Sequence, residues 1–340
     1  MAVQKALVSE TAKAPWRVVE NVDIASVGPT DVLVKVSFAG LNPSDWLSQS
    51  YAPPFLVYPF TGGLEGSGIV VDVGVDVKHV KKGDRVFFPG GFEGARPTFK
   101  EYCVCPGAFT LEQGATIPVG IATVVSGIWG TAPRGVGLTA LWEEGGRTKY
   151  AGQPALVIGG ASCVGQYAIQ MARLNGFSTI ITTASLKHES WLKSLGATHV
   201  LDRNLPSEEL AIVVKKITNG ALVPYAYDAI STKETLHLAY DLVADDGALV
   251  IVEPFSKELD EKIKLNDRKR IGRPYATLTV PESIELGLEL WKHLGSWLKE
   301  GLIIPNRVDL VADSLQEIPA ALEKMKNGAV SGTKWVARVL

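Results

Sequence analysis

The residues with the clearest chemistry form a segment of small side chains, Ala155-Leu-Val-Ile-Gly-Gly-Ala-Ser-Cys-Val-Gly165. Its apolar start predicts a short strand, and helical apolar spacing over Val164–Asn175 predicts a helix after the turn. Small residues let backbone amides approach a pyrophosphate, and a helix start adds unpaired N–H groups and a positive dipole end. Ser162 stands where a middle glycine is usual. We expect this loop to bind a dinucleotide; a purely structural glycine turn is the alternative.

The residues beyond the next strand indicate which dinucleotide binds. An NAD site usually places a carboxylate about 20 residues past the loop, where it accepts from the ribose 2′-hydroxyl. The segment Thr182-Thr-Ala-Ser185 carries no acid, and Lys187 and Arg203 follow it. A hydroxyl and two cations suit a 2′-phosphate, so we favour NADPH. Ser185 is also typical of a helix N-cap, which leaves ordinary surface polarity as the alternative.

The elements that must position this loop alternate between apolar strands and amphipathic helices. The predicted strands are Ala155–Gly159, Ser178–Thr183, His199–Asp202, Tyr225–Ile230 and Ala248–Val252. This alternation is typical of a parallel sheet covered by helices on both faces. Val252 and Glu253 end a strand on its carboxyl side, where open α/β sheets bind ligands, so we expect them near the cofactor.

The two ends of the chain have a different character. The first third is rich in short apolar or alternating runs broken by Pro and Gly clusters, which predicts a compact barrel-like or sandwiched sheet. These runs are Asp31–Val36, Gly66–Val77, Arg85–Pro89 and Glu101–Pro106. Helical spacing follows over Thr123–Leu141. Towards the C-terminus we predict one long amphipathic helix, Ile284–Glu300, and strands around Val308 and Trp335.

Composition narrows the class of protein. At 340 residues the chain suits two domains, and 46% hydrophobic with 21% charged residues is ordinary for a globular protein. The net charge of −2 comes with no basic stripe, so we expect no nucleic-acid partner. No run reaches the roughly 18 apolar residues of a transmembrane helix, and Met1–Val8 does not suit a signal peptide. We expect a cytoplasmic protein without a membrane partner.

Several segments together resemble the medium-chain dehydrogenase/reductase superfamily. They are Gly40-Leu-Asn-Pro-Ser-Asp-Trp46, Gly63-Leu-Glu-Gly-Ser-Gly68, Gly83-Asp-Arg-Val86, Phe99-Lys-Glu-Tyr102, the glycine loop, Tyr227-Asp-Ala-Ile230 and Ser331-Gly-Thr-Lys334. The Asn-Pro-Ser-Asp-Trp form looks like the zinc-free quinone reductase and enoyl reductase branch, and most like the stand-alone trans-acting enoyl reductases of polyketide synthases. The resemblance implies an α/β fold, with a Rossmann doubly wound parallel sheet inserted in a β-rich GroES-like catalytic domain. We expect the catalytic domain at 1–122, the cofactor domain at 123–275 and a return to the catalytic domain at 276–340.

The same resemblance bears on metal. Zinc-using relatives take ligands from a Cys in the segment matching Gly40–Asp45 and from a His before the acid matching Glu65. This chain has Asn42 and Leu64 there, and Ala115–Gly130 contains no Cys or His. A catalytic zinc needs three protein ligands, so we expect no metal.

Contacts to the cofactor are carried over from the same relatives, position by position. The resemblance places Asn42, Pro43, Ser44 and Asp45 along the nicotinamide half and Thr123 at the entry to the cofactor domain. It places Ala161, Ser162, Cys163 and Val164 in the pyrophosphate loop, and Thr333 and Lys334 in a C-terminal segment that returns to the cofactor. Each of these is equally compatible with a turn or strand end that binds nothing.

Without a metal, reduction of a conjugated C=C bond suits the remaining groups best. Hydride goes to the β-carbon, donors hold the enolate, and a proton arrives at the α-carbon. Many relatives carry a Lys where Leu47 stands. Tyr51 is our candidate proton donor, with loop packing of that residue and protonation by solvent as the alternatives.

Two other functions remain open, namely a metal-free NADPH-dependent carbonyl reductase and a catalytically silent NADPH sensor. The expected partner is a small conjugated carbonyl compound or an acyl chain on a carrier protein. The sequence is compatible with a monomer or a homodimer.

Overall fold

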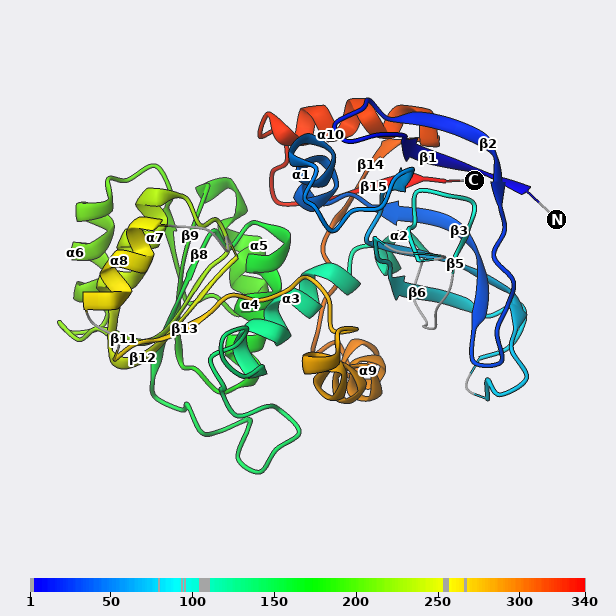
Figure 1. Ribbon diagram of the computed structural model, residues 1–340. Helices are drawn as coiled ribbons and strands as arrows, with labels where there is room; N and C mark the ends of the chain where they lie inside the picture. Colours follow the sequence, from blue (N-terminus) through cyan, green and yellow to red (C-terminus); the bar gives the residue numbers. More distant parts are fainter. Residues whose placement is uncertain are drawn as a thin grey trace. The chain divides into compact units, whose positions relative to one another are not determined.

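The computed structural model describes residues 3–78, 80–92, 94, 96–103, 111–252, 257–265 and 268–339, and its contacts divide the chain into two units (Figure 1). Unit 1 contains Met1–Val119 and Pro305–Leu340, and unit 2 contains Gly120–Ile304. One unit is therefore inserted in the other, as expected. The division falls at 119 and 304, whereas the expected domain boundaries lay at 122 and 275.

Unit 2 is built on a six-stranded parallel sheet in the order β10-β9-β8-β11-β12-β13. The strands are β8 (Pro154–Ile158), β9 (Thr179–Ala184), β10 (His199–Asp202), β11 (Val223–Asp228), β12 (Val243–Ile251) and β13 (Arg270–Gly272). The chain winds outward from β8 to β10 and then outward from β11 to β13. This order is that of a doubly wound Rossmann sheet, which confirms the expected fold, and its direction reverses between β8 and β11.

Helices cover both faces of this sheet (Figure 1). They are α4 (Cys163–Leu174), η1 (Leu186–His188), α5 (Glu189–Leu195), α6 (Ser207–Ile217), α7 (Lys233–Leu242) and α8 (Lys257–Leu265). On one face Leu210 of α6, Leu236 of α7 and Leu259 of α8 pack in one buried cluster with Leu156 and Ile251 of the strands. This burial of long apolar side chains is the main force that holds the layers together.

Unit 2 also holds α3 (Pro118–Trp129) from Gly120 onward, η2 (Pro281–Ser283) and α9 (Ile284–Lys299). The α9 helix confirms the predicted amphipathic helix. Its Trp297 ring lies 6.3 Å from that of Trp129 and 6.2 Å from that of Trp142, which explains why 276–304 belongs to unit 2. The helical expectation over Thr123–Leu141 was too long, since α3 ends at Trp129.

The reason for this early end is local. After Trp129 the chain turns back, and the N–H of Gly137 donates to the carbonyl of Gly130 at 3.0 Å. Pro133 has no N–H to continue a helix, and Gly137 has a φ of 63° that favours glycine.

The described residues of unit 1 form two sheets. The smaller has the order β2-β1-β4 and the larger β14-β15-β3-β5-β6, with β7 paired to β3. The strands are β1 (Val3–Ser9), β2 (Arg17–Asp23), β3 (Val32–Gly40), β4 (Phe60–Thr61), β5 (Glu65–Val73), β6 (Arg85–Pro89), β7 (Tyr102–Cys103), β14 (Val308–Ala312) and β15 (Lys334–Arg338). The helices are α1 (Pro43–Tyr51), α2 (Leu111–Gly114), η3 (Leu315–Glu317) and α10 (Ile318–Lys326).

Both ends of the chain build the larger sheet. Strand β15 lies between β14 and β3, and its Val336 pairs with Gly40. Val34, Phe88 and Trp335 then share one buried cluster. The expected β-rich domain formed by both ends of the chain is therefore confirmed.

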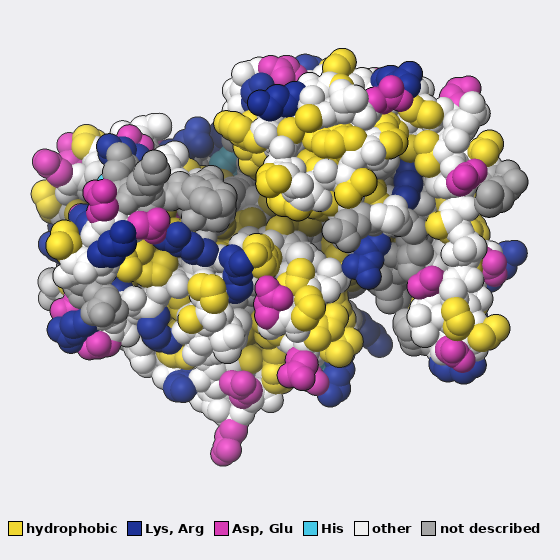
Figure 2. All heavy atoms as spheres, viewed as in Figure 1, with side chains coloured by type: hydrophobic (Ala, Val, Ile, Leu, Met, Phe, Trp, Pro, Cys, Tyr) yellow, Lys and Arg dark blue, Asp and Glu magenta, His cyan; other side chains and the backbone are white. Residues whose placement is uncertain are grey.

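The surface and the helices show two further features. On the face in Figure 2, Lys and Arg side chains are interspersed with Asp and Glu rather than gathered in a band of one sign. Among the residues that the structure describes, no helix is both long enough and apolar enough to cross a membrane.

Candidate active site

The glycine loop after β8 is packed too tightly for larger residues. Gly159 has a φ of 77°, and a Cβ there would lie 2.3 Å from Cγ1 of Ile230 in the turn after β11. A Cβ on Gly160 would lie 2.0 Å from Oγ1 of Thr182 in β9. The loop therefore sits at the point where the sheet order reverses, which is where sheets of this kind bind ligands.

The serine of this loop caps the helix that follows. Ser162 is the N-cap of α4, and its Oγ accepts from the N–H of Gly165 at 3.0 Å. The N–H groups of Ala161 and Val164 donate to no residue in the described ranges. Open amides at a helix start suit an anion, so the loop and Cys163 within its first turn fit the pyrophosphate of a dinucleotide.

The residues that we expect to bind the ribose 2′-phosphate of NADPH lie at one edge of the sheet. Ala184 of β9 pairs with Asp202 of β10, and the N–H of Arg203 donates to the carbonyl of Ala184 at 2.9 Å. Ser185 follows directly, and Lys187 lies two residues further on in η1. Lys187 and Arg203 are exposed, and within the described part of the chain neither forms an ion pair. The structure thus brings two open cations to the ends of adjacent strands.

A buried acid organises the neighbouring turn. Asp228 ends β11, and its Oδ1 accepts from the N–H of Ile230 at 3.0 Å and of Ser231 at 2.9 Å. The Oγ of Ser231 accepts from the N–H of Val252 at 3.0 Å, which fixes the end of β12. Burial raises the pKa of Asp228 above its ordinary value. Glu253, also expected near the cofactor, lies outside the described residues.

Thr123 is fixed to the same sheet. Its side chain is buried in α3, and its carbonyl accepts from the Tyr227 hydroxyl of β11 at 3.3 Å. The helix that carries Thr123 is therefore anchored on the strand next to β8.

In unit 1 the Asn-Pro-Ser-Asp segment forms a closed helix cap. The N–H of Asn42 donates to Oδ2 of Asp45 at 2.8 Å, and Pro43 and Ser44 occupy the first two positions of α1. Oδ1 of Asp45 accepts from the N–H of Gly63 at 3.2 Å. Burial raises the pKa of Asp45 to about 7, although these two N–H groups and the Lys334 ammonium lower it.

A buried ion pair lies against this cap. The Nζ of Lys334 lies 2.5 Å from Oε1 of Glu65 and 2.6 Å from Oδ1 of Asn42. Nδ2 of Asn42 donates to the same Oε1 at 3.0 Å, and the N–H of Val119 donates to Oε2 at 2.8 Å. Thr333, directly before Lys334, is half-buried. Every charge in the cluster therefore has a partner, as burial requires.

Glu65 was not among our expected cofactor or catalytic residues, although its sequence surroundings could have indicated a buried, paired acid. A carboxylate between small residues at the start of an apolar strand must find a cation or several donors if it is buried. The acid in Gly63-Leu-Glu-Gly-Ser-Gly68 has this setting.

The donor set around Glu65 bears on metal binding. The chain has Asn42 and Leu64 at the positions where the resemblance places metal ligands. The cation that contacts the neighbouring Glu65 is the ammonium group of Lys334. In the part of the chain that the structure covers, no three His, Cys, Asp or Glu side chains are grouped to hold a metal ion.

Tyr51 has a different setting. It is the last residue of α1, and 71% of it is exposed. Leu47, on the same helix, is half-buried. The phenol is therefore accessible to solvent at the end of this helix.

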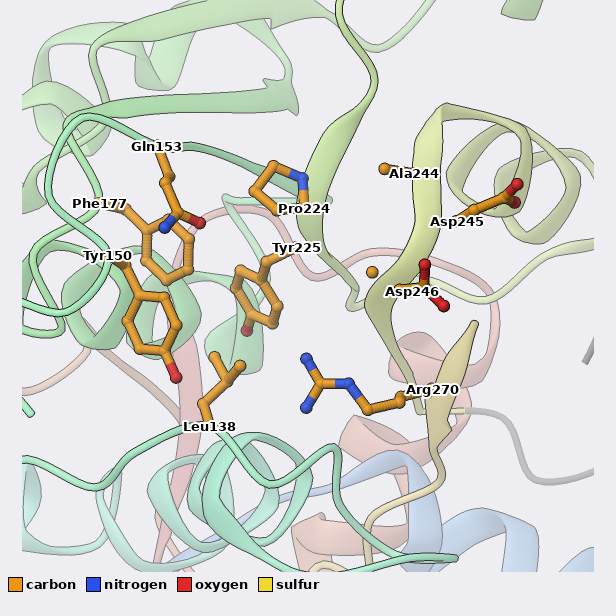
Figure 3. A pocket seen from close by; sticks show the side chains of 11 residues that line it. Leu138, Tyr150, Gln153, Phe177, Pro224, Tyr225, Ala244, Asp245, Asp246 and Arg270 are labelled. Atoms are coloured by element: carbon orange, nitrogen blue, oxygen red, sulfur yellow. The ribbon is translucent and has the colours of Figure 1, made fainter. Parts of the chain in front are cut away.

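A separate cavity of about 140 Å³ lies at the amino-terminal ends of the strands of the parallel sheet (Figure 3). It adjoins the first residues of β11 and β13, and the Arg270 side chain reaches towards Leu138 and Tyr225. The Tyr225 ring stacks on Phe177 at 5.2 Å. Because the dinucleotide loop follows the carboxyl end of β8, this cavity is not part of the cofactor site.

Comparison with known proteins places the chain in a family. Residues 28–126 match the alcohol dehydrogenase GroES-like domain, and residues 163–272 match the model described as zinc-binding dehydrogenase. A zinc-type alcohol dehydrogenase-like protein of Schizosaccharomyces pombe is 29% identical over 347 residues, covering 94% of this chain and 97% of its own. The trans-enoyl reductase tndF of Aspergillus flavipes is 30% identical over 329 residues, covering 91% of each chain.

The chain belongs to the medium-chain dehydrogenase/reductase superfamily. Among solved structures, an alcohol dehydrogenase superfamily protein from Novosphingobium aromaticivorans has the same fold, with a TM-score of 0.80 at 22% identity over 99% of this chain and 100% of its own. As an enoyl reductase-like member of the superfamily, the protein is an oxidoreductase, and its fold implies a nicotinamide cofactor.

Proposed function

We propose that this superfamily member is an NADPH-dependent reductase that reduces a C=C bond conjugated to a carbonyl, in an enoyl, enone or quinone substrate, without a metal. The observation that carries the proposal is the contact of the Lys334 ammonium with Glu65 and Asn42. The ammonium group of Lys334 neutralises the buried Glu65 carboxylate. Glu65 follows Leu64, one of the positions at which zinc-using relatives carry a metal ligand. Hydrogen-bond donors must then stabilise negative charge on the substrate, which suits a delocalised enolate better than a localised alkoxide.

The cofactor preference follows from the edge formed by β9 and β10. Lys187 and Arg203 supply two cations, Ser185 supplies a hydroxyl, and no acid stands at the end of β9. These groups suit a 2′-phosphate, while the open amides of Ala161 and Val164 suit the pyrophosphate. When bound, NADPH would supply a hydride to the β-carbon of an enoyl or enone substrate, and a proton added at the α-carbon of the enolate completes the saturated carbonyl product. With a quinone, the hydride and the protons give the hydroquinone.

The chain's own residues position these events. Asp45 and the Lys334–Glu65 pair fix Asn42, so that Pro43 and Ser44 are held at the start of α1. The Tyr51 phenol at the end of this helix is the proposed proton donor, with solvent as its alternative.

The test is NADPH oxidation by chelator-treated protein, followed through the loss of NADPH absorbance. A conjugated enal, an enone, a quinone and a saturated ketone are compared, each repeated with NADH. We expect turnover of conjugated substrates with NADPH, with a reduced C=C bond in the products of the enal and the enone and a hydroquinone from the quinone.

Each of the other outcomes leads to a different conclusion. Turnover of the saturated ketone alone identifies a carbonyl reductase. NADPH binding without turnover of any free substrate indicates a carrier-bound acyl substrate or a sensor, and a carrier-bound enoyl thioester then separates these two. Activity lost on chelation contradicts the metal-free assignment.

A further inference from the structure

A second cavity, of about 400 Å³, lies within unit 2 and is not explained by the cofactor site. Ser126 and Trp129 of α3 form one wall, the 130–134 turn forms another, and Tyr275 and Leu286 complete it. This volume falls within the roughly 300–1,000 Å³ typical of small-molecule pockets.

The hydroxyl of a serine in α3 lines this cavity. Ser126 is only 2% exposed, and within the described ranges its hydroxyl forms no hydrogen bond. It follows Thr123 by three positions on α3, so the two side chains are neighbours on the helix surface. A ligand atom that accepts a hydrogen bond at Ser126 would therefore lie close to Thr123, which we expect to contact the cofactor.

The remaining walls indicate the charge of the ligand. The Arg134 guanidinium lies 3.5 Å from the centroid of the Tyr275 ring and donates to its hydroxyl, so its donors are partly engaged. Glu282 and Glu285 are exposed at the rim. Two carboxylates against the one Arg134 guanidinium leave these three groups with a net negative charge, which repels a negatively charged ligand, while Trp129 and Leu286 offer apolar surface.

We infer that this cavity holds the substituent of the substrate, and that it selects neutral aromatic or branched aliphatic conjugated ketones and aldehydes over those with an anionic end. The inference rests on the proposed function. Ser126 offers the bound molecule a hydroxyl donor in this cavity, and Leu286 sets the width of the space.

Binding without turnover tests the inference. Benzylacetone, the saturated product of benzalacetone reduction, is titrated calorimetrically into the full chain with and without NADP⁺. We expect binding that falls at least about 10-fold for the analogue with a carboxylate para on the ring. Leu286→Trp fills the cavity and weakens benzylacetone binding by about 10-fold or more, while Ser126→Ala weakens it about 5-fold through the lost hydrogen bond.

Leu288→Trp is the matched control, because Leu288 lies on the same helix, is 64% exposed and does not line the cavity. We expect it to bind benzylacetone as the unchanged chain does. Thermal melting and NADPH binding of Leu286→Trp confirm that the fold is intact.

Each result decides one of the two proposals. Absence of benzylacetone binding, or equal binding by Leu286→Trp, overturns the inference even if benzalacetone is reduced. Equal binding of the ring carboxylate overturns the selection by charge. Binding that Leu286→Trp weakens, combined with no reduction of any conjugated substrate, supports the cavity as a binding site and overturns the proposed function.

Discussion

At the scale of single residues, the contact between Lys334 and Glu65 has the largest energetic consequence. Both side chains are almost completely removed from solvent. An ion pair in such a place adds little net stability compared with apolar residues, but the loss of one partner leaves an uncompensated buried charge.

We expect Lys334→Met to lower the free energy of unfolding by about 3–5 kcal/mol, because the Glu65 carboxylate loses its cation. Urea unfolding followed by circular dichroism measures the change. The double variant Lys334→Met with Glu65→Gln should recover much of this loss, since the remaining amide is neutral. A double variant no more stable than Lys334→Met would contradict the charge argument.

Asp45 should make stability depend on pH. Its folded pKa of about 7 lies above the ordinary value of 3.8, with Glu65 and Lys334 as the charged neighbours. Between these values the folded chain binds more protons than the unfolded chain, so Asp45 makes the free energy of unfolding fall as pH rises from about 4 to about 7. The cause is that folding must bury the ionised carboxylate at the higher pH.

The measurement is urea unfolding of the unchanged chain and of Asp45→Asn at several pH values. The stability of Asp45→Asn relative to the unchanged chain should rise across this range and level off above it. Parallel pH profiles for the two proteins would show that Asp45 titrates at its ordinary pKa.

The sequence predicted part of this cluster. The Asn-Pro-Ser-Asp motif indicated Asn42 and Asp45, and the C-terminal motif indicated Lys334. The contact between them was not predictable from local patterns, because Lys334 and Asn42 are 292 positions apart. Pairing at such a distance becomes visible only when β15 is placed beside β3.

At the scale of elements, a substitution at the start of α4 can distinguish helix capping from pyrophosphate binding. Ser162 caps the helix, and it also stands where a pyrophosphate is expected. An aspartate at this position caps equally well, but its negative charge repels an anion.

We expect Ser162→Asp to melt within a few degrees of the unchanged chain while its Kd for NADPH rises at least about 10-fold, or roughly 1.4 kcal/mol. Ser162→Ala is the comparison, expected to lose about 1 kcal/mol of stability with a smaller effect on Kd. NADPH fluorescence titration and thermal melting measure both quantities. Unchanged NADPH affinity in Ser162→Asp would place the phosphates elsewhere.

The ends of β9 and β10 should determine cofactor choice. Arg203→Ala removes an open cation beside Ala184, so we expect KM for NADPH to rise about 10-fold and KM for NADH to change little. Lys187→Ala should act in the same direction. Steady-state kinetics with both cofactors provide the measurement, and equal losses for NADH and NADPH would contradict recognition of a 2′-phosphate.

The strands of unit 2 were predictable because each is a short apolar run next to a turn signal. The end of α3 was less visible, since apolar spacing continues past Trp129 into the turn that contains Gly130 and Pro133. The apolar periodicity predicted which residues after Trp129 are buried. The tertiary contacts of the turn, which the periodicity does not show, determined their backbone conformation.

At the scale of the whole molecule, the boundary lies at Ile304 rather than at the expected residue 275. Helix α9 therefore belongs to unit 2 and stabilises that unit. The amphipathic pattern of α9 predicted one buried face, but it carried no information on which unit covers that face. The stacked rings of Trp142 and Trp297 supply the answer.

We expect scanning calorimetry to show separate transitions for the two units. NADP⁺ should raise the transition temperature of unit 2, which carries the dinucleotide loop, with the logarithm of its concentration above Kd. Trp297→Ala should lower the same transition, with a loss of about 3–5 kcal/mol. Lys334→Met should lower the other transition, and a Trp297→Ala effect confined to that other transition would contradict the assignment of α9 to unit 2.

The position of β15 in its sheet also has a consequence for synthesis of the chain. Ribosomes make β3 early, yet its Phe38–Gly40 end pairs with Val336–Arg338, which are made only after all of unit 2. The inserted unit can therefore fold on the ribosome while β3 still has an open edge, the reverse of the usual N-terminal-first order. A nascent chain that stalls before Lys334 would expose that edge, and chaperones that hold unpaired strands would be expected to bind it at that stage.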